Sequence, residues 1–138
     1  MRPAERYQGI TALRERARKL EFAQAAAAAE AARNAHEAET LALEAARAEA
    51  MPTEAPITAA QLMFTSAALA SQAHALEASA QTVARLEAPE AAARGRLVDA
   101  ATDRLVADRW VDRERRARYV EADRKADREA SDRASRVL

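Results

Sequence analysis

The sequence of 138 residues contains no cysteine, two glycines and four prolines, and only 4% of its residues are aromatic. Without cysteine the chain can form neither disulfides nor thiolate metal sites. The scarcity of β-branched and aromatic residues argues against strands. No apolar run approaches the roughly 20 residues needed to cross a bilayer, and the N-terminus MRPAERYQGI lacks the apolar core of a secretory signal. We therefore expect a cytoplasmic protein.

Alanine is the most abundant residue and occupies 41 positions. It has the highest intrinsic helix propensity, and Leu, Arg, Glu, Lys and Gln, which make up much of the remainder, are also good helix formers. An alanine methyl buries little area, so this inventory suits a thin, elongated protein with a narrow seam better than a wide globular core. The sequence predicts an all-α protein with a single domain over residues 1–138.

One break divides the helical sequence. Pro52 and Pro56 are the only two prolines within five residues, and proline disfavours helix both at its own position and at the residue before it. We therefore predict a first helix over about 4–50, a turn at 51–57 and a second helix over about 58–138. The two helices should fold as an antiparallel coiled-coil hairpin.

The residues after the break form a helix start signal. Thr58 can act as the N-cap, and Gln61 stands where it completes a capping box. Ile57 and Leu62 have the spacing of a hydrophobic staple. These signals agree on where the second helix begins.

Both predicted helices carry heptad repeats, which favour a coiled coil. The expected stripe of the second helix is Leu62, Leu69, Leu76 and Val83. The expected stripe of the first helix, interrupted by Gln24 and Asn34, is Ile10, Leu13, Ala17, Leu20, Ala27, Ala31, Ala38, Leu41, Ala45 and Ala48.

The turn suggests how the two helices align. If Ala50 faces Ala59, residue i lies opposite about residue 109 − i, which places Phe22 near Leu86. The second helix then overhangs the first by some thirty residues beyond Asp108, about 45 Å as helix. Acid-before-base pairs at i, i+4 support such an isolated helix. They are Asp112–Arg116, Glu114–Arg118, Glu121–Lys125, Glu129–Arg133 and Asp132–Arg136.

Two features of the second helix leave alternatives open. Trp110 falls in the predicted overhang among arginines, as is typical of binding hot spots. Alternatively, the first helix is shifted or the N-terminal residues fold over this side chain. Pro89, with Gly95 six residues later, is either a hinge or a kink tolerated in a weak coiled coil.

Charge is balanced in total but uneven along the chain. Residues 34–90 carry two basic and eight acidic groups, whereas residues 1–33 carry seven and four, and residues 91–138 thirteen and ten. A nucleic-acid binder would show a concentrated basic face. The ten acids among the arginines of the last third argue against that class.

The sequence carries no recognisable catalytic arrangement. Gly9 and Gly95 stand alone, so there is no phosphate-binding loop. Ser, Thr and Asp show no nucleophile-base pattern. The only histidines are His36 and His74, which approach each other in the register above, where His36 lies opposite Ala73. They are either a metal pair or histidines that are solvated or lie at the edge of the seam. We expect no enzyme activity, no cofactor and no small-molecule substrate.

Two segments carry a resemblance to a known family. The opening RYQGITALRERARKLEFAQA and the C-terminal DRLVADRWVDRERRARYVEADRKADREASDRAS resemble the FliJ family of flagellar type III export proteins. FliJ-like chains carry an acid-base-apolar triplet, an acid-arginine pair, a tyrosine and a late acidic stretch. Those places are taken here by Asp108-Arg109-Trp110, Asp112-Arg113, Tyr119-Val120-Glu121 and Ser131-Asp132-Arg133, the last with one acid where the family commonly has two.

The resemblance implies a non-enzymatic adaptor, a central stalk in a hexameric export ATPase that also contacts the cytoplasmic domain of the export gate. Export chaperones are further partners, and the chain would associate peripherally with the inner face of the plasma membrane. The family's gate-contacting stripe corresponds to Met63, Ala67, Ala70 and His74, and Trp110, Arg113 and Tyr119 would face the ATPase ring. A YscO-type injectisome stalk is a related alternative, and a structural coiled coil that self-assembles through its overhang is an alternative of another class.

Overall fold

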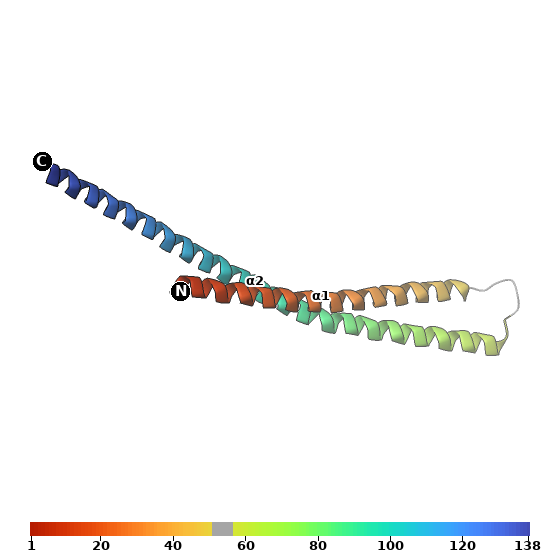
Figure 1. The fold of residues 1–138 in the computed structure, drawn as a ribbon. Helices are drawn as coiled ribbons and strands as arrows, with labels where there is room; N and C mark the ends of the chain where they lie inside the picture. The colour runs from red at the N-terminus through yellow and green to blue at the C-terminus, as the bar shows by residue number, and fades with distance from the viewer. Residues whose placement is uncertain (51–56) are drawn as a thin grey trace. The chain divides into compact units, whose positions relative to one another are not determined.

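The computed structural model describes residues 1–50 and 57–138. Over these ranges the chain forms two α-helices and no strand (Figure 1): α1 (Pro3–Glu49) and α2 (Ala59–Val137). The helices pack against each other. Contacts such as Gln8 with Asp108 and His36 with Ser79 show that they run antiparallel. The predicted all-α helical hairpin is confirmed, whereas the predicted turn lies, except for Ile57, outside the described residues.

The start of α2 has the predicted capping box. The Thr58 amide donates to Gln61 Oε1 at 3.0 Å, and the Gln61 amide donates to Thr58 Oγ1 at 3.1 Å. The Thr58 carbonyl accepts from the amide of Leu62 at 3.0 Å, as expected for an N-cap residue. These bonds satisfy amides that a helix start otherwise leaves unpaired, which explains why α2 begins at Ala59. The predicted staple residues, Ile57 and Leu62, both remain exposed.

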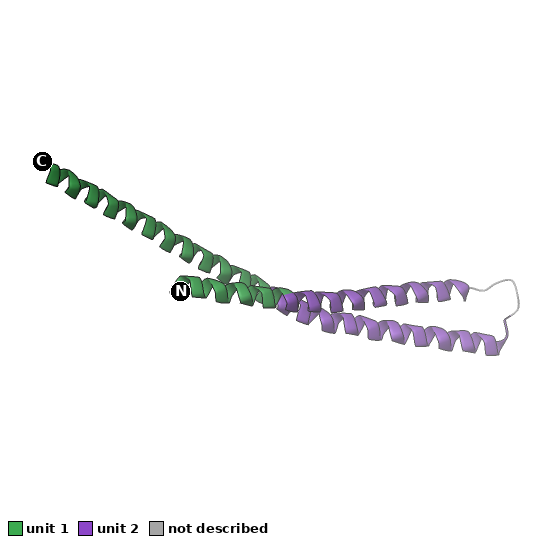
Figure 2. Ribbon diagram, in the orientation of Figure 1, with its two compact units in different colours: residues 1–19, 96–138 green, residues 20–95 purple. Residues whose placement is uncertain are grey.

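The chain divides into two compact units (Figure 2). Unit 1 comprises residues 1–19 and 96–138, and unit 2 comprises residues 20–95. By sequence, unit 1 carries 18 basic and 12 acidic residues, whereas unit 2 carries 4 basic and 10 acidic residues. Unit 1 is therefore net positive and unit 2 net negative.

The side of α1 that faces α2 differs from the predicted one. The buried and half-buried positions with 3-4 spacing are 4, 8, 11, 15 and 18 in unit 1, and 22, 25, 29, 32, 36, 39, 43, 46 and 50 in unit 2. The predicted stripe, which includes Ile10, Leu13, Leu20 and Leu41, is exposed throughout. That prediction is wrong. On α2 the predicted stripe is right for Leu69, Leu76 and Val83, which are at least half-buried, and wrong for Leu62, which is exposed.

The sizes of the facing side chains explain this choice in unit 2. There α1 turns mostly alanines toward α2, among them the fully buried Ala29. The facing positions of α2 carry larger residues, such as Leu76 and Val83. Small residues opposite large ones let side chains interdigitate while the helices stay close. Rotating Leu20 and Leu41 of α1 into this contact would set large side chains against large ones.

The predicted alignment of the helices is also wrong. Gln8 contacts Asp108 and His36 contacts Ser79, so residue i lies opposite about residue 116 − i, one heptad away from the expected register. A shift of seven residues is one full heptad, so the same stripe of α2 still faces α1. The prediction of this stripe could therefore be right although the predicted register was wrong. Residues 59–64 of α2 are exposed. At the other end, the last half-buried residue is Arg118, so the unpaired part of α2 begins at residue 119.

Candidate functional site

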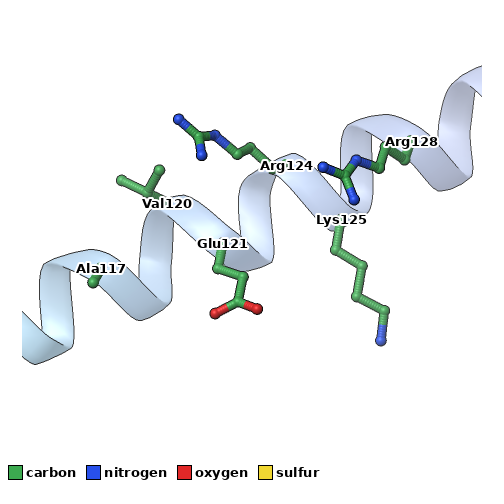
Figure 3. A pocket seen from close by; sticks show the side chains of 6 residues that line it. All are labelled: Ala117, Val120, Glu121, Arg124, Lys125 and Arg128. Carbon is green, nitrogen blue, oxygen red and sulfur yellow. The ribbon is translucent and has the colours of Figure 1, made fainter.

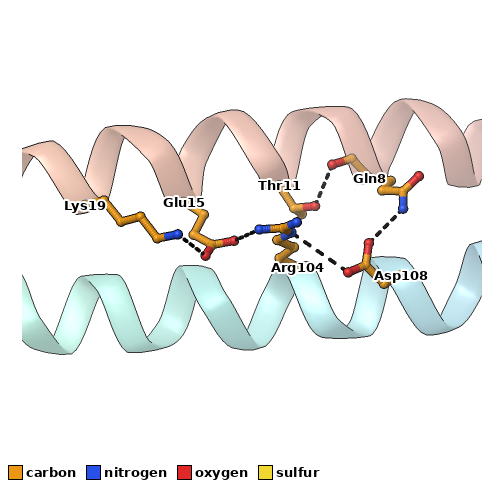
Figure 4. Close-up of polar contacts among 6 residues, drawn as sticks. All are labelled: Gln8, Thr11, Glu15, Lys19, Arg104 and Asp108. Carbon is orange, nitrogen blue, oxygen red and sulfur yellow. Dashed lines mark hydrogen bonds and ion pairs between the residues drawn. The ribbon is translucent and has the colours of Figure 1, made fainter.

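In unit 1 the contact between the helices contains a polar cluster (Figure 4). The Glu15 carboxylate accepts a hydrogen bond from Arg104 Nη1 at 2.9 Å and pairs with Lys19 Nζ at 3.1 Å. Arg104 Nε also lies 3.9 Å from Asp108 Oδ2. Gln8 Nε2 donates to the other oxygen of Asp108 at 2.7 Å. The cluster therefore joins two residues of α2 to three of α1.

These contacts shift the protonation of their charged members. The hydrogen bond from Arg104, and then the one from Lys19, lowers the pKa of Glu15 below its ordinary value of 4.5. The bond to Glu15 raises the pKa of Arg104 in turn. Glu15 is thus held as a carboxylate with its charge matched. An acid committed to two cations is not available as a general base, and the cluster serves to align the helices.

Acidification should weaken unit 1 through Glu15. Its pKa is lower in the folded chain than in the unfolded one, so its stabilising contribution is present above pH 4.5 and is lost as the pH falls below that value. We expect the free energy of unfolding to decline between pH 5 and acid pH, measured by urea titration with circular dichroism. Glu15→Gln should be less stable at pH 7 and should show a shallower decline. The exposed control Glu77→Gln should keep the wild-type profile, and equal profiles for both variants would contradict this assignment.

Unit 2 contains a second set of cross-helix ion pairs. Arg33 of α1 binds Glu90 of α2 and also Glu87, the latter with Nε 3.3 Å from Oε1. Glu90, which is 8% exposed, is further paired with Arg94 at 3.6 Å. The hydrogen bond to Glu90, followed by that to Glu87, raises the pKa of Arg33. Arg94 also places its guanidinium 5.6 Å from the ring centroid of Phe22, where the predicted register had Leu86.

The two histidines do not come together. His36 Nδ1 lies 2.8 Å from Ser79 Oγ, whereas the predicted register placed Ala73 opposite this histidine. His74 is exposed on α2. Among the residues that the structure describes, no group of three or more His, Cys, Asp or Glu side chains is arranged to hold a metal ion. His36 therefore faces Ser79, and not the position beside His74 that the predicted register gave it.

The proposed gate-binding residues share one exposed face of α2. Met63, Ala67, Ala70 and His74 follow each other at i, i+4, i+7 and i+11 and are all exposed, Met63 to 73%. This spacing keeps them along one side of a helix. They lie in unit 2, and their binding to an export gate stays a prediction.

The three residues predicted to face the ATPase have different surroundings. The Trp110 ring lies 6.0 Å from the Tyr7 ring, centroid to centroid, at 55°, a common geometry for aromatic pairs. Trp110 is therefore 37% exposed and is contacted by Tyr7 of α1, so the alternative in which the first helix covers this side chain is the one observed. Arg113 is exposed, and Tyr119 is 72% exposed in the unpaired part of α2. Tyr7, which the sequence reasoning missed, could have been found from the correct register.

A hollow of about 630 Å³ lies along α2 from residue 117 to residue 128 (Figure 3). Its lining residues are Ala117, Val120, Glu121, Arg124, Lys125 and Arg128. All six belong to one helix, and Figure 3 shows their side chains spread along its surface. A small-molecule site needs walls that enclose its ligand and exclude water. This hollow has none, because its lining residues all belong to a single helix.

Neither described helix contains a stretch that is both long and apolar enough to cross a membrane. Comparisons of the chain with protein-family models, with curated proteins and with solved structures found no match. The functional proposal therefore rests on the chain's own residues and on the resemblance seen in its sequence.

Proposed function

We propose that the chain is a non-enzymatic coiled-coil adaptor of a flagellar type III export apparatus, a central stalk in the hexameric export ATPase that links this ring to the export gate. The observation that carries the proposal is the FliJ-like run from Asp108 to Arg133, which continues beyond Arg118 on a helical segment that no other described part of the chain covers. A charged helix that stays unpaired is suited to bind another protein. A YscO-type injectisome stalk would use the same surfaces.

The distribution of charge and exposure supports two separate contacts. Unit 1 is net positive and carries the exposed Tyr119, whereas unit 2 is net negative and carries the exposed stripe from Met63 to His74. Complementary charge steers association and selects among partners. Unit 1 should therefore engage the ATPase, and unit 2 the cytoplasmic domain of the gate protein.

The proposal predicts stimulation of an ATPase by a protein without ATPase activity. The purified chain should not hydrolyse ATP, but it should raise the turnover of the cognate hexameric ATPase under conditions in which the ring assembles. Since charge guides this contact, the stimulation should fall as salt is raised from 50 to about 300 mM. An unrelated helical hairpin of similar length serves as the control. Intrinsic hydrolysis, or no effect on an assembled cognate ring, would count against the proposal.

A structural coiled-coil protein that self-assembles through its overhang is the second candidate, favoured by the exposed helix beyond Arg118. Such a protein would form stable assemblies of more than two chains and would leave the ATPase unaffected. Sedimentation velocity together with the ATPase assay separates the two functions.

A further inference from the structure

Helix α1 carries a second heptad stripe that α2 does not cover. Its large members are Ile10, Leu13, Leu20 and Leu41, whose exposed fractions are 48, 65, 62 and 59%. Single exposed apolar residues are common on protein surfaces. Here, however, they share a regular 3-4 spacing with a series of exposed alanines over almost the whole uninterrupted helix.

The two stripes of α1 lie on nearly opposite sides of the helix. Successive residues of a helix are rotated by 100° about its axis. Each position of the outer stripe comes either one residue before or two residues after a position that faces α2. Ile10, for example, comes one residue before Thr11 and two residues after Gln8. Averaged over the heptad, the two stripes are separated by roughly 160°. A helix with apolar stripes on opposite sides is built to pack against two neighbours. The hairpin supplies one of them.

The order of residues in this outer stripe is self-complementary. Its positions pair so that the two numbers of each pair add up to 58, which is the pattern of a helix packed antiparallel against its own copy. The pairs are Ile10 with Ala48, Leu13 with Ala45, Ala17 with Leu41, Leu20 with Ala38, Gln24 with Asn34, and Ala27 with Ala31.

The chemistry of these pairs matches as well as their positions. Every large aliphatic residue meets an alanine, so side chains fill space while the backbones approach closely. The only polar members, Gln24 and Asn34, meet each other, where two amides can exchange hydrogen bonds. A parallel pairing would instead place leucine on leucine and Gln24 on its own copy.

The charges beside the stripe favour the same orientation. Arg14 and Arg16 flank its N-terminal half, and Glu37, Glu44 and Glu49 flank its C-terminal half. All five are exposed. An antiparallel arrangement brings Arg14 and Arg16 of one copy beside the C-terminal glutamates of the other, whereas a parallel one brings Glu44 of one copy beside Glu49 of the other.

We propose that the outer face of α1 is a homodimer interface, on which α1 of a second copy lies antiparallel with residue i opposite residue 58 − i. The contact buries the outer stripe and leaves the Met63–His74 face of α2 uncovered. The proposal does not depend on the adaptor function, because it concerns a different surface and its test requires no ATPase.

The association state of the purified chain shows whether a second copy occupies the outer face of α1. Sedimentation equilibrium of the full chain should show a monomer–dimer equilibrium. Leu41→Lys should weaken the dimer about a hundredfold, because the substitution occurs twice in the dimer and each loss of a buried leucine costs roughly tenfold. The matched control Leu105→Lys changes a leucine of α2 with nearly the same exposed fraction, 58%, and should leave the dissociation constant unchanged. A chain that stays monomeric at all concentrations, or equal effects of the two variants, would overturn the proposal.

Cysteine cross-linking tests the orientation, since the chain has no cysteine of its own. Ala27→Cys and Ala31→Cys chains are mixed and oxidised, and each is also oxidised alone. The antiparallel pairing predicts a disulfide-linked heterodimer of the two variants and little cross-linking of either alone, because position 27 faces position 31 and not itself. Efficient self-cross-linking of both variants would establish a parallel dimer and refute the pairing.

Discussion

Pro89→Ala should stabilise the hairpin by about 3 kcal/mol, the difference between proline and alanine inside a helix. Pro89 lies well inside α2 and is exposed, so its replacement disturbs no packed side chain. Alanine restores an amide that can donate to the carbonyl of Arg85, and it removes the clash between the proline ring and that carbonyl. Urea unfolding followed by far-UV circular dichroism, at one protein concentration, measures the change.

The same variant decides between a hinge and a tolerated kink. If Pro89 is a tolerated kink, the variant gains stability and stimulates the cognate ATPase as the wild type does. If Pro89 is a hinge, the more stable variant loses stimulation. Ala88→Gly is a useful control, because it loosens the neighbouring exposed position and should lower stability by about 1 kcal/mol. An unchanged stability of Pro89→Ala would show that α2 has already adapted to the missing amide.

The fold class and the start of α2 could be predicted because both depend on local chemistry. Helix propensity is a property of each residue, and Thr58 and Gln61 form the capping box within a single turn. The stripe of Leu69, Leu76 and Val83 could be recognised as well, since α2 has no competing regular stripe of large residues over that stretch. Such features need no knowledge of the other helix.

The contact face of α1 and the register could not be predicted in this way. Helix α1 carries two stripes with the same heptad spacing, and periodicity cannot tell which one faces α2. The outcome depends on pairs between the helices, such as Glu15 with Arg104 and Arg33 with Glu90. Polar residues at seam positions also hide the true stripe from a search for apolar residues. Heptads repeat every seven residues, so an error of one heptad in the register still places the same stripe of α2 against α1.

That error in register also altered the proposed ATPase surface. The predicted overhang began near Asp108 and left Trp110 uncovered, whereas the structure pairs its ring with that of Tyr7. The exposed aromatic of the unpaired helix is Tyr119. Of the two aromatic candidates, Tyr119 is thus the more exposed, and it lies where no other described part of the chain covers α2.

Substitutions in the two units should separate the two proposed contacts. Tyr119→Ala should weaken ATPase binding by roughly tenfold or more, the loss typical of an aromatic hot spot, while gate binding stays unchanged. Trp110→Ala should act in the same direction. Met63→Asp combined with His74→Ala should weaken gate binding and leave stimulation of the ATPase intact. Binding to each purified partner, measured by biolayer interferometry alongside circular dichroism of every variant, provides the readouts.

Tyr7→Ala distinguishes a partner contact from a packing effect at Trp110. It removes the other ring of the pair and so loosens unit 1 without deleting a residue proposed to touch the ATPase. If Trp110 contacts the ring directly, Trp110→Ala impairs ATPase binding well beyond the effect of Tyr7→Ala. If the two variants are equally impaired, Trp110 acts through packing and Tyr119 alone carries the aromatic contact. Should the unit 1 and unit 2 substitutions damage the same interaction to the same degree in folded proteins, the separation of the two binding surfaces is refuted.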